Sequence, residues 1–308
     1  MPESGNRVRA IGECMIELSD LGGGKLSLAY GGDTLNTAVY LARLGVGVDY
    51  ATALGDDPWS EEMLAFWGRE GVGTDLVQRL PGKLPGLYMI RLGPGGERSF
   101  FYWRSDSAAR QMLKAGEPDR LAAALAQSRV LYFSGVTLSI LDDASRDRLF
   151  AILERARADG ASIAFDSNYR PRGWPDAGTA RAAMERAFRL ADIGLPTFDD
   201  EHALHGDATP EASIERLAAL GLGEVAVKLG AEGVLVAQDG AFLRIPADKV
   251  KAIDTTAAGD GFNAGYLAAR LSGAEPEAAA RAGVRLAAAI VQHRGAIIPK
   301  DAMPPPSG

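Results

Sequence analysis

The sequence predicts an α/β protein whose body has three layers, with helices on both faces of a mostly parallel β-sheet, and which carries a second, small β-sheet. Strand-like apolar runs alternate with segments of helical periodicity through most of the 308 residues, which is typical of parallel sheets covered by helices. Two pairs of short strands around glycine-rich turns interrupt this alternation in the first third of the chain. The composition, 47% hydrophobic and 24% charged, is that of an ordinary globular protein.

The elements of the body follow one another in order. The first predicted helix has apolar residues at helical spacing and is followed by Gly45, and the second begins with Pro58. The predicted strands of the body are 8–12, 48–54, 130–134, 162–166, 193–195, 225–229, 234–237 and 242–245, the last two pairing across 238–240. The predicted helices are 33–44, 58–70, 119–127, 145–159, 181–190, 198–205, 211–220, 259–271 and 277–292.

The two interruptions are predicted to be hairpins. One surrounds Gly22-Gly23-Gly24, and the other surrounds a turn of glycine and proline at 93–96. Because they stand outside the α/β alternation, we expect them to form a small sheet that acts as a lid. The prediction is a single domain over 1–308 into which hairpins at approximately 14–31 and 86–104 are inserted. Their predicted strands are 15–18, 26–30, 86–92 and 98–104.

Net charge and residue counts exclude several classes of function. The net charge of -7 argues against nucleic acid or a membrane surface as a partner. The single cysteine, Cys14, rules out an intrachain disulfide and a cysteine-based metal cage, and we expect it to be buried. His202 and His205 are expected on a solvated helix face and not at a metal. No apolar run approaches the roughly 18 residues of a membrane span, and 1–7 lack the apolar core of a signal peptide, so we expect a cytoplasmic protein.

The segment 254–265 has the strongest signal for chemistry. Small residues, among them Ala257, Ala258 and Gly259, run into Asp260, and an apolar helical pattern follows. The first amides of such a helix lack partners, and together with the helix dipole they attract an anion such as phosphate. A carboxylate at this place repels phosphate, so its presence there needs a reason. A general base that acts beside the transferred group would be such a reason. The alternative interpretation is that Asp260 caps the helix, and the local pattern leaves both open.

Two further loops follow predicted strands at the edge of the sheet where such folds bind their ligands, beyond the carboxyl ends of the strands. These loops are 166–170 and 228–233, and together with 254–260 they indicate a nucleotide site. Gly230 and Gly233 allow a ligand to approach the backbone closely, although an ordinary glycine turn explains them as well. Neither a Walker A motif nor a dinucleotide fingerprint occurs, so we expect neither a P-loop enzyme nor a Rossmann dehydrogenase.

Two segments resemble the signatures of the ribokinase-like, or PfkB, family of sugar kinases. Residues 254–265, with the pattern Asp-Thr-x-Ala-Ala-Gly-Asp-x-x-x-Ala-Gly, are similar to the C-terminal signature, and 31–36 with Gly45 and Gly55 are similar to the N-terminal one. Thr34 departs from the small residue that is usual there. The resemblance covers essentially the whole chain and implies the ribokinase-like fold, a sugar substrate, and ATP with Mg²⁺.

Further segments resemble those family members that phosphorylate 2-dehydro-3-deoxy-D-gluconate to its 6-phosphate. These segments are 12–18, 31–37, 84–88, 101–104, 168–172 and 294–299. The substrate carries one carboxylate, and Arg104 and Arg170 can each offer it a planar donor fork. Tyr88 and Tyr102 can offer hydroxyls and flat apolar faces. The alternative interpretation is an exposed strand-end charge for Arg104 and a sheet aromatic for Tyr102.

The resemblance also implies a role for each residue of the site. Asp260 is the implied general base, and the helix start formed by Ala257, Ala258, Gly259 and Asp260 is the implied anion hole. The implied substrate residues are Gly31, Gly32, Asp33, Thr34, Leu35, Asn36, Tyr88, Tyr102, Arg104, Arg170 and Asp260. The implied nucleotide residues are Asn168, Lys228, Gly230, Ala231, Glu232, Gly233, Ala257, Ala258 and Gly259. The family's Asn-x-x-Glu motif near the metal is Thr-Phe-Asp-Asp here, at 197–200, so we assign no protein ligand to the metal.

Two other functions remain open at this point. A kinase of a neutral sugar, such as fructose or ribose, would have the same fold without needing two arginines at one end of its substrate. A sugar-acid sensor would keep the fold and lose catalysis, although the intact Asp260 favours an enzyme. Exposed strand edges of the small sheet invite pairing, so we expect a homo-oligomer whose ligands are a sugar acid and ATP, without nucleic acid or membrane as partners.

Overall fold

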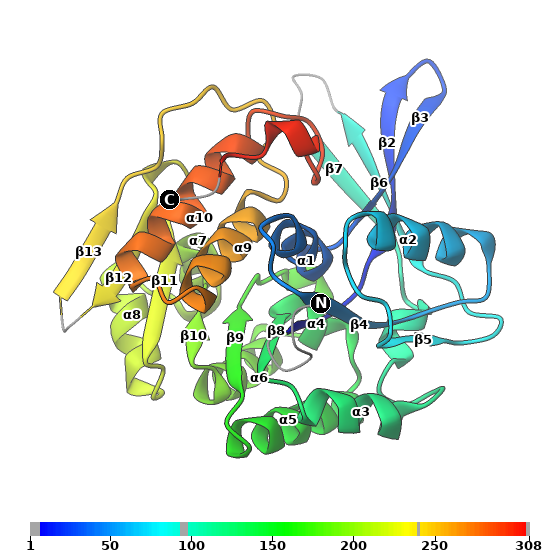
Figure 1. Ribbon diagram of the computed structural model, residues 1–308, viewed down its shortest axis with the longest axis horizontal. Helices are drawn as coiled ribbons and strands as arrows, with labels where there is room; N and C mark the ends of the chain where they lie inside the picture. Colours follow the sequence, from blue (N-terminus) through cyan, green and yellow to red (C-terminus); the bar gives the residue numbers. More distant parts are fainter. Residues whose placement is uncertain (1–6, 93–97, 239–240, 306–308) are drawn as a thin grey trace.

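The computed structural model describes residues 7–92, 98–238 and 241–305, and its body is built on a nine-stranded sheet in the order β13-β12-β11-β10-β9-β8-β1-β4-β5 (Figure 1). Neighbours from β11 to β5 pair in parallel, and β12 and β13 join antiparallel at one edge. The mostly parallel sheet predicted from the sequence is therefore confirmed. Its strands are β1 (Val8–Ile11), β4 (Val48–Leu54), β5 (Val77–Arg79), β8 (Val130–Ser134), β9 (Ser162–Asp166), β10 (Ile193–Gly194), β11 (Glu224–Lys228), β12 (Val234–Gln238) and β13 (Ala241–Ile245).

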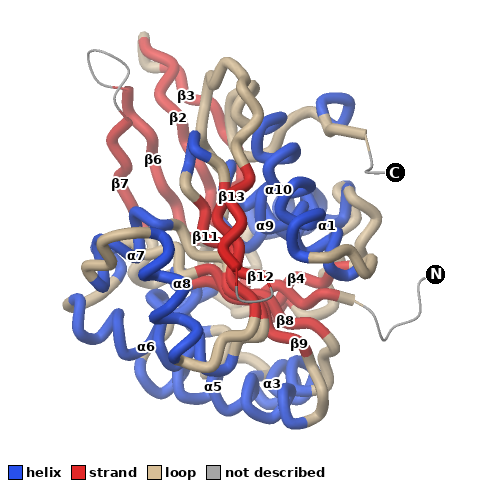
Figure 2. The backbone as a smooth tube through the Cα atoms, turned by 90° about the vertical axis from the view of Figure 1, so that its left-hand side faces the viewer, coloured by secondary structure: helices blue, strands red, loops and turns tan. Residues whose placement is uncertain are grey.

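Helices cover both faces of this sheet (Figure 2). Successive strand residues point to opposite faces, so in β8 Leu131 and Phe133 join one buried cluster and Tyr132 joins the other. The helices on the Tyr132 side are α1 (Asp33–Arg43), α2 (Pro58–Arg69), α9 (Ala258–Leu271) and α10 (Pro276–Ile290). Those on the opposite side are α3 (Pro118–Ala126), α4 (Gly135–Ile140), α5 (Asp143–Ala158), α6 (Ala177–Leu190), α7 (Phe198–His205) and α8 (Pro210–Ala219).

The two predicted hairpins form one small sheet that projects from the body (Figure 1). Its strands are β2 (Met15–Gly22), β3 (Lys25–Gly31), β6 (Gly86–Leu92) and β7 (Arg98–Trp103), in the order β3-β2-β6-β7. Parallel pairing of β2 with β6 joins the hairpins. Gly22, Gly23 and Gly24 turn the first hairpin with φ angles of 78°, 61° and 76°, in the region that favours glycine. The predicted turn at 93–96 and residues 239–240 of the predicted turn at 238–240 lie outside the described residues.

The fold adds two elements that the sequence does not predict, and it places one histidine differently from the prediction. The sequence does not predict β5, which is too short to show alternation, or α4, which begins at a capping box formed by Ser134 and Thr137. The expectation that His205 is solvated is wrong, because its side chain is only 4% exposed and lies beside Glu201. Desolvation lowers the pKa of His205 to about 4, so the ring is neutral at neutral pH.

Two expectations from composition can be compared with the structure. Cys14 is buried, as predicted. Across the three described ranges, no helix combines the length and the apolar character that crossing a membrane requires.

Candidate active site

A cavity of about 340 Å³ lies at the carboxyl ends of the parallel strands, between the body and the small sheet. β1, β9 and β11 end at this edge, so Glu13, Asp166 and Lys228 reach the cavity. Most of the predicted site residues meet here. The lining residues are Glu13, Met15, Gly31, Gly32, Asp33, Asn36, Tyr88, Phe100, Tyr102, Arg104, Val136, Asp166, Asn168, Arg170, Thr197, Lys228 and 255–260.

Helix α9 begins at this cavity. Its N-cap residue, Ala257, has a φ of 60°, a left-handed conformation that alanine rarely adopts. Within the described part of the chain no side chain caps this helix, so Asp260 is not its cap. A Cβ atom added to Gly259 would lie 3.6 Å from Lys228 Nζ, which places an ammonium beside the helix start. The first-turn amides, the positive end of the helix dipole and this ammonium together favour an anion.

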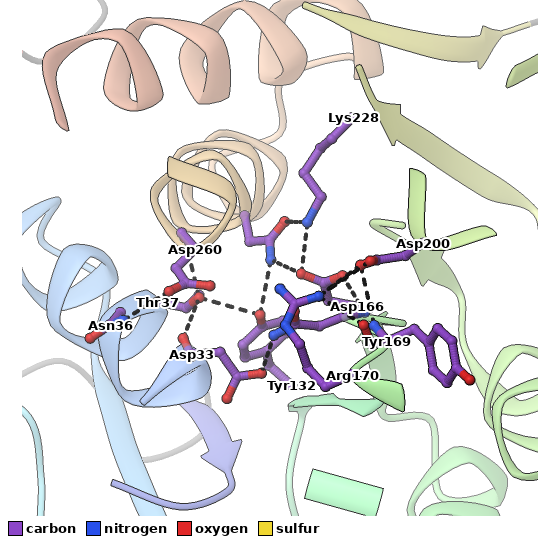
Figure 3. A network of polar contacts seen from close by, with 12 residues as sticks. Asp33, Asn36, Thr37, Tyr132, Asp166, Tyr169, Arg170, Asp200, Lys228 and Asp260 are labelled. Carbon is purple, nitrogen blue, oxygen red and sulfur yellow. Dashed lines mark hydrogen bonds and ion pairs between the residues drawn. The ribbon is translucent and has the colours of Figure 1, made fainter. Parts of the chain in front are cut away.

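The Asp260 carboxylate lies in the first turn of α9 and points toward α1 (Figure 3). Asn36 Nδ2 donates to Asp260 Oδ2 at 2.8 Å, and the Thr37 hydroxyl lies 3.2 Å from the main-chain oxygen of Asp260. Desolvation, with a further contribution from the Asp33 carboxylate, raises the pKa of Asp260 to about 7, although the bond from Asn36 opposes this. A carboxylate that titrates near neutral pH can act as a general base.

A buried network holds Lys228 beside the start of α9 (Figure 3). Lys228 Nζ donates to Asp166 Oδ2 at 2.7 Å and to Asn263 Oδ1 at 3.1 Å. Asn263 Nδ2 donates in turn to Asp166 Oδ2 at 2.7 Å and to the Tyr132 hydroxyl at 3.0 Å. The side chains of Lys228 and Asp166 are 8% and 4% exposed. Removing one partner of such a pair leaves an uncompensated buried charge and costs about 3–5 kcal/mol, so the network is expected to keep the ammonium in place.

Sequence reasoning gave no individual role to three members of this network. Asp166 begins the loop 166–170, which was placed at the predicted nucleotide site because the carboxyl ends of parallel strands meet at one edge, but its carboxylate was not singled out. Asn263 lies three residues after Asp260, on the same side of α9, and helical spacing could have indicated it. Tyr132 sits within an apolar strand that gives no sign of a polar contact.

The loop after β9 carries two residues that line the cavity, Asn168 and Arg170. Asn168 has a φ of 31°, and its Nδ2 donates to Asp33 Oδ2 at 2.6 Å, so it links this loop to α1. Arg170 Nη1 lies 3.2 Å from Asp200 Oδ1, and Asp200 also accepts from the main-chain nitrogen of Tyr169 at 3.2 Å. Asp200, the last residue of the segment that departs from the family's metal motif, therefore contacts an arginine.

The small sheet forms the opposite wall of the cavity. Arg104 is ion-paired with the buried Glu13, and its side chain is 21% exposed, so it is not a free strand-end charge. The rings of Phe100 and Tyr102 stack with centroids 6.4 Å apart, and the Tyr88 ring lies 5.9 Å from that of Tyr102. The wall thus combines a guanidinium group with flat aromatic faces.

Two predicted substrate residues point away from the cavity. The side chains of Thr34 and Leu35 are buried in the body, where the Thr34 hydroxyl lies 3.0 Å from that of Tyr50. Successive helix residues point about 100° apart, so Asp33 and Asn36 face the cavity while the two between them face the core. This corrects the prediction for those two side chains.

The predicted nucleotide loop is only partly in contact with the cavity. Lys228 lines it, whereas residues 230–233 do not, and Gly230–Glu232 form a short 3₁₀ turn. A nucleotide role for 230–233 stays a prediction.

A helix start that favours an anion, with an ammonium and a carboxylate that titrates near neutral pH, is typical of phosphoryl-transferring enzymes. The chain belongs to the pfkB family of carbohydrate kinases, which it matches over residues 6–303. It is 47% identical over 305 residues to 2-dehydro-3-deoxygluconokinase of Dickeya dadantii, covering 96% of this chain and 98% of that relative. It is 44% identical to 2-dehydro-3-deoxygluconokinase of Escherichia coli strain K12, covering 97% and 99%. Fructokinase with bound ATP from Xylella fastidiosa has the same fold, with a TM-score of 0.83 at 24% identity over 97% of this chain and 95% of that one.

Proposed function

We propose that this chain transfers the γ-phosphoryl group of ATP to the C6 hydroxyl of 2-dehydro-3-deoxy-D-gluconate. The names of relatives that are 44% and 47% identical over nearly their whole length support this substrate. The observation that carries the proposal is that one cavity holds Asp260 at the start of α9 together with Arg104 and Arg170. A fructokinase of the same fold that binds ATP supports ATP as the donor.

In the proposed reaction, the C6 hydroxyl oxygen attacks the γ-phosphorus while Asp260 accepts the hydroxyl proton. The bond from the γ-phosphorus to the bridging oxygen breaks, and ADP leaves. Charge on the transferred group is stabilised by the ammonium of Lys228 and by the amides of Gly259, Asp260 and Ala258. The Ala258 amide also donates to the main-chain oxygen of Thr255 at 3.3 Å, and the transferred group would share this donor. Asn36, which donates to Asp260 at 2.8 Å, keeps the carboxylate oriented toward the hydroxyl.

At the other end of the substrate, Arg104 and Arg170 are the proposed partners of the sugar-acid carboxylate. Charge-assisted, bidentate contacts of arginine with carboxylates are strong and directional. Asp33 is the proposed partner of sugar hydroxyls, and the rings of Tyr88 and Tyr102 cover the apolar faces of the sugar. A neutral sugar would leave both guanidinium groups without this partner.

The nucleotide is proposed to lie on Asn168, Lys228, 230–233 and 257–259. Among the described residues, no group of three or more His, Cys, Asp or Glu side chains is placed to hold a metal ion. Mg²⁺ does not need such a group, because it keeps several waters and is bound by nucleotide phosphates with one or two carboxylates. When bound, the ion neutralises phosphate charge, and we assign it no protein ligand.

Release of ADP across a panel of sugars tests this function. The chain is given ATP, Mg²⁺ and, in turn, 2-dehydro-3-deoxygluconate, its C4 epimer, fructose and ribose. We expect kcat/KM to be roughly 10²-fold or more higher for the sugar acid than for the neutral sugars, because the latter lose the charge-assisted contacts. Preferred turnover of fructose or ribose would indicate a neutral-sugar kinase, and binding of the sugar acid without ADP release would indicate a sensor.

The reaction rate is expected to depend on pH through Asp260. Only the ionised carboxylate accepts a proton, so with a pKa raised to about 7 we expect kcat/KM to fall about tenfold per pH unit below 7 and to level off above it. Asp33→Asn removes a like charge and should shift this acid limb to lower pH. The profile of kcat/KM against pH measures the shift, and Asp199→Asn, an exposed carboxylate on α7, is the control. An unmoved limb in Asp33→Asn would contradict this account of the raised pKa.

We also propose that the small sheet is a lid that closes over the sugar and excludes water. Hydrogen exchange of its amides, measured by mass spectrometry, is expected to slow when 2-dehydro-3-deoxygluconate saturates the protein. The buried strand β8 of the body serves as the reference, because its exchange should not change. Exchange in the small sheet that is the same with and without the sugar acid would mean that the sheet is fixed.

The outer face of the lid suggests a homo-oligomer. The strand register places Leu28, Phe101 and Trp103 on the face opposite to Tyr88 and Tyr102, and they are 43%, 47% and 60% exposed. Apolar patches and free strand edges of this kind favour association, so we propose that copies of the chain pair through the lid.

Because ATP is the proposed donor, we infer that the protein acts in the cytoplasm.

A further inference from the structure

All four strands of the small sheet enter or leave the body near one buried carboxylate, that of Glu13. Glu13 follows β1, and its side chain has no exposed surface. The main-chain oxygen of Glu13 occupies the space that a side chain would need at Gly32, directly after β3. A Cβ atom at Gly86, the first residue of β6, would lie 2.9 Å from Glu13 Oε1. The start of β6 at Gly86 therefore packs against this carboxylate, and Gly32 packs against the main chain of the same residue.

The Glu13 carboxylate accepts two hydrogen bonds from the segment that follows β7. One comes from a terminal nitrogen of Arg104 and the other from the Ser107 hydroxyl. Both Glu13 and Arg104 line the cavity. Arg104 Nε is buried, and within the described ranges it has no hydrogen-bond partner. An unsatisfied buried donor of this kind costs free energy. The side chain of Arg104 is nevertheless 21% exposed, so a bound carboxylate can contact the part of it that faces the cavity.

We propose that Glu13 is a positioning residue that holds the guanidinium of Arg104 at the cavity, so that the carboxylate of a sugar acid meets an oriented donor fork. The inference rests on the proposed function and adds a specificity residue to it. An unrestrained arginine has many rotamers and loses them when a ligand binds, which weakens binding about twofold to tenfold per side chain. Glu13 imposes that order before the substrate arrives, because the Ser107 hydroxyl and the main chain at Gly86 hold the carboxylate itself.

The charge of Glu13 also acts in the opposite direction, because it repels the carboxylate of the substrate. That charge is already compensated by Arg104 and by the bond from Ser107. We therefore expect the ordering of Arg104 to outweigh the repulsion. The two effects change KM in opposite directions, so the sign of the change in KM distinguishes between them.

Steady-state kinetics of Glu13→Gln test the inference. Glutamine keeps the shape and an acceptor for Ser107 but removes the ion pair. We expect KM for 2-dehydro-3-deoxygluconate to rise about threefold to tenfold, with kcat within about twofold and KM for ATP unchanged. In an Arg104→Met background the same substitution should not raise KM further, because effects that pass through one shared partner are not additive.

The matched control is Glu70→Gln, which breaks the ion pair between Glu70 and Arg43. The side chains of Glu70 and Arg43 are 10% and 7% exposed, and neither residue lines the cavity. It should leave both KM values unchanged. Three results would overturn the inference. The first is an unchanged or lower KM in Glu13→Gln. The second is a rise in KM that multiplies with the rise caused by Arg104→Met. The third is an equal loss of kcat on every substrate together with a lower Tm, which would show that Glu13 has a purely structural role.

A replacement variant and a comparison with the wild-type chain keep the outcome of this experiment unambiguous. If Glu13→Gln does not fold, Glu13→Asp takes its place under the same criteria, because it keeps the charge and shortens its reach. A wild-type chain that does not phosphorylate the sugar acid would contradict the proposed function. Wild-type turnover together with an unchanged KM in the variant would contradict the role of Glu13 alone.

Discussion

Asp260→Asn is expected to lower kcat for phosphorylation of 2-dehydro-3-deoxygluconate by roughly 10²-fold or more, the scale of a positioned general base. The substitution removes the proton acceptor and keeps the size of the side chain. Its amide oxygen still offers an acceptor to Asn36, so we expect binding of the sugar acid to be largely kept. Rapid-quench measurement of a single turnover reports the chemical step, and calorimetry reports binding.

The same variant has a second readout that does not depend on activity. Burial raises the pKa of Asp260 in the folded protein to about 7, above its ordinary value of 3.8, so folding favours the protonated form. The ionised carboxylate therefore lowers stability progressively as the pH rises from about 4 to about 7. Asp260→Asn should raise Tm near pH 8 and leave it unchanged near pH 4. Single-turnover transfer at the wild-type rate would show that Asp260 is not the base.

Arg104→Met is expected to raise KM for 2-dehydro-3-deoxygluconate roughly tenfold to a hundredfold. A charge-assisted hydrogen bond is worth about 1.5–3 kcal/mol, and about 1.4 kcal/mol corresponds to one power of ten. Weak turnover of a neutral six-carbon analogue should change little, because that substrate does not use the charge. Arg104→Lys should restore only part of the affinity, because lysine offers a point charge without the donor fork.

The ion pair with Glu13 requires a control for stability. Arg104→Met leaves the Glu13 carboxylate buried and uncompensated, which we expect to lower Tm. The free energy of unfolding should fall by up to about 3–5 kcal/mol, the cost of breaking a buried ion pair. Adding Glu13→Gln removes both charges and should recover Tm without restoring the wild-type KM. If the double variant loses activity equally on the sugar acid and the neutral analogue, Arg104 supports the lid or the phosphates, and the sugar-acid assignment would rest on family membership alone.

Local patterns in the sequence were sufficient to predict the architecture. The alternation of strands and helices predicted the parallel sheet with helices on both faces, and Gly22-Gly23-Gly24 predicted the first hairpin. The start of α9 was equally predictable, because small residues before a helical pattern leave the first amides accessible. Element ends were less predictable: α6 begins at Ala177, where Asp176 caps it, several residues before the apolar pattern starts.

The environment of the site residues was decided only by the tertiary structure. Asn36 and Asp260 are 224 positions apart, and Glu13 and Arg104 are 91 apart. Such contacts depend on the order of strands in the sheet and on the place where the small sheet joins the body, which periodicity does not specify. The base at Asp260 illustrates the difference. Its position follows from the local motif, but its raised pKa comes from burial and from Asp33, which folding brings to it from the far end of the chain.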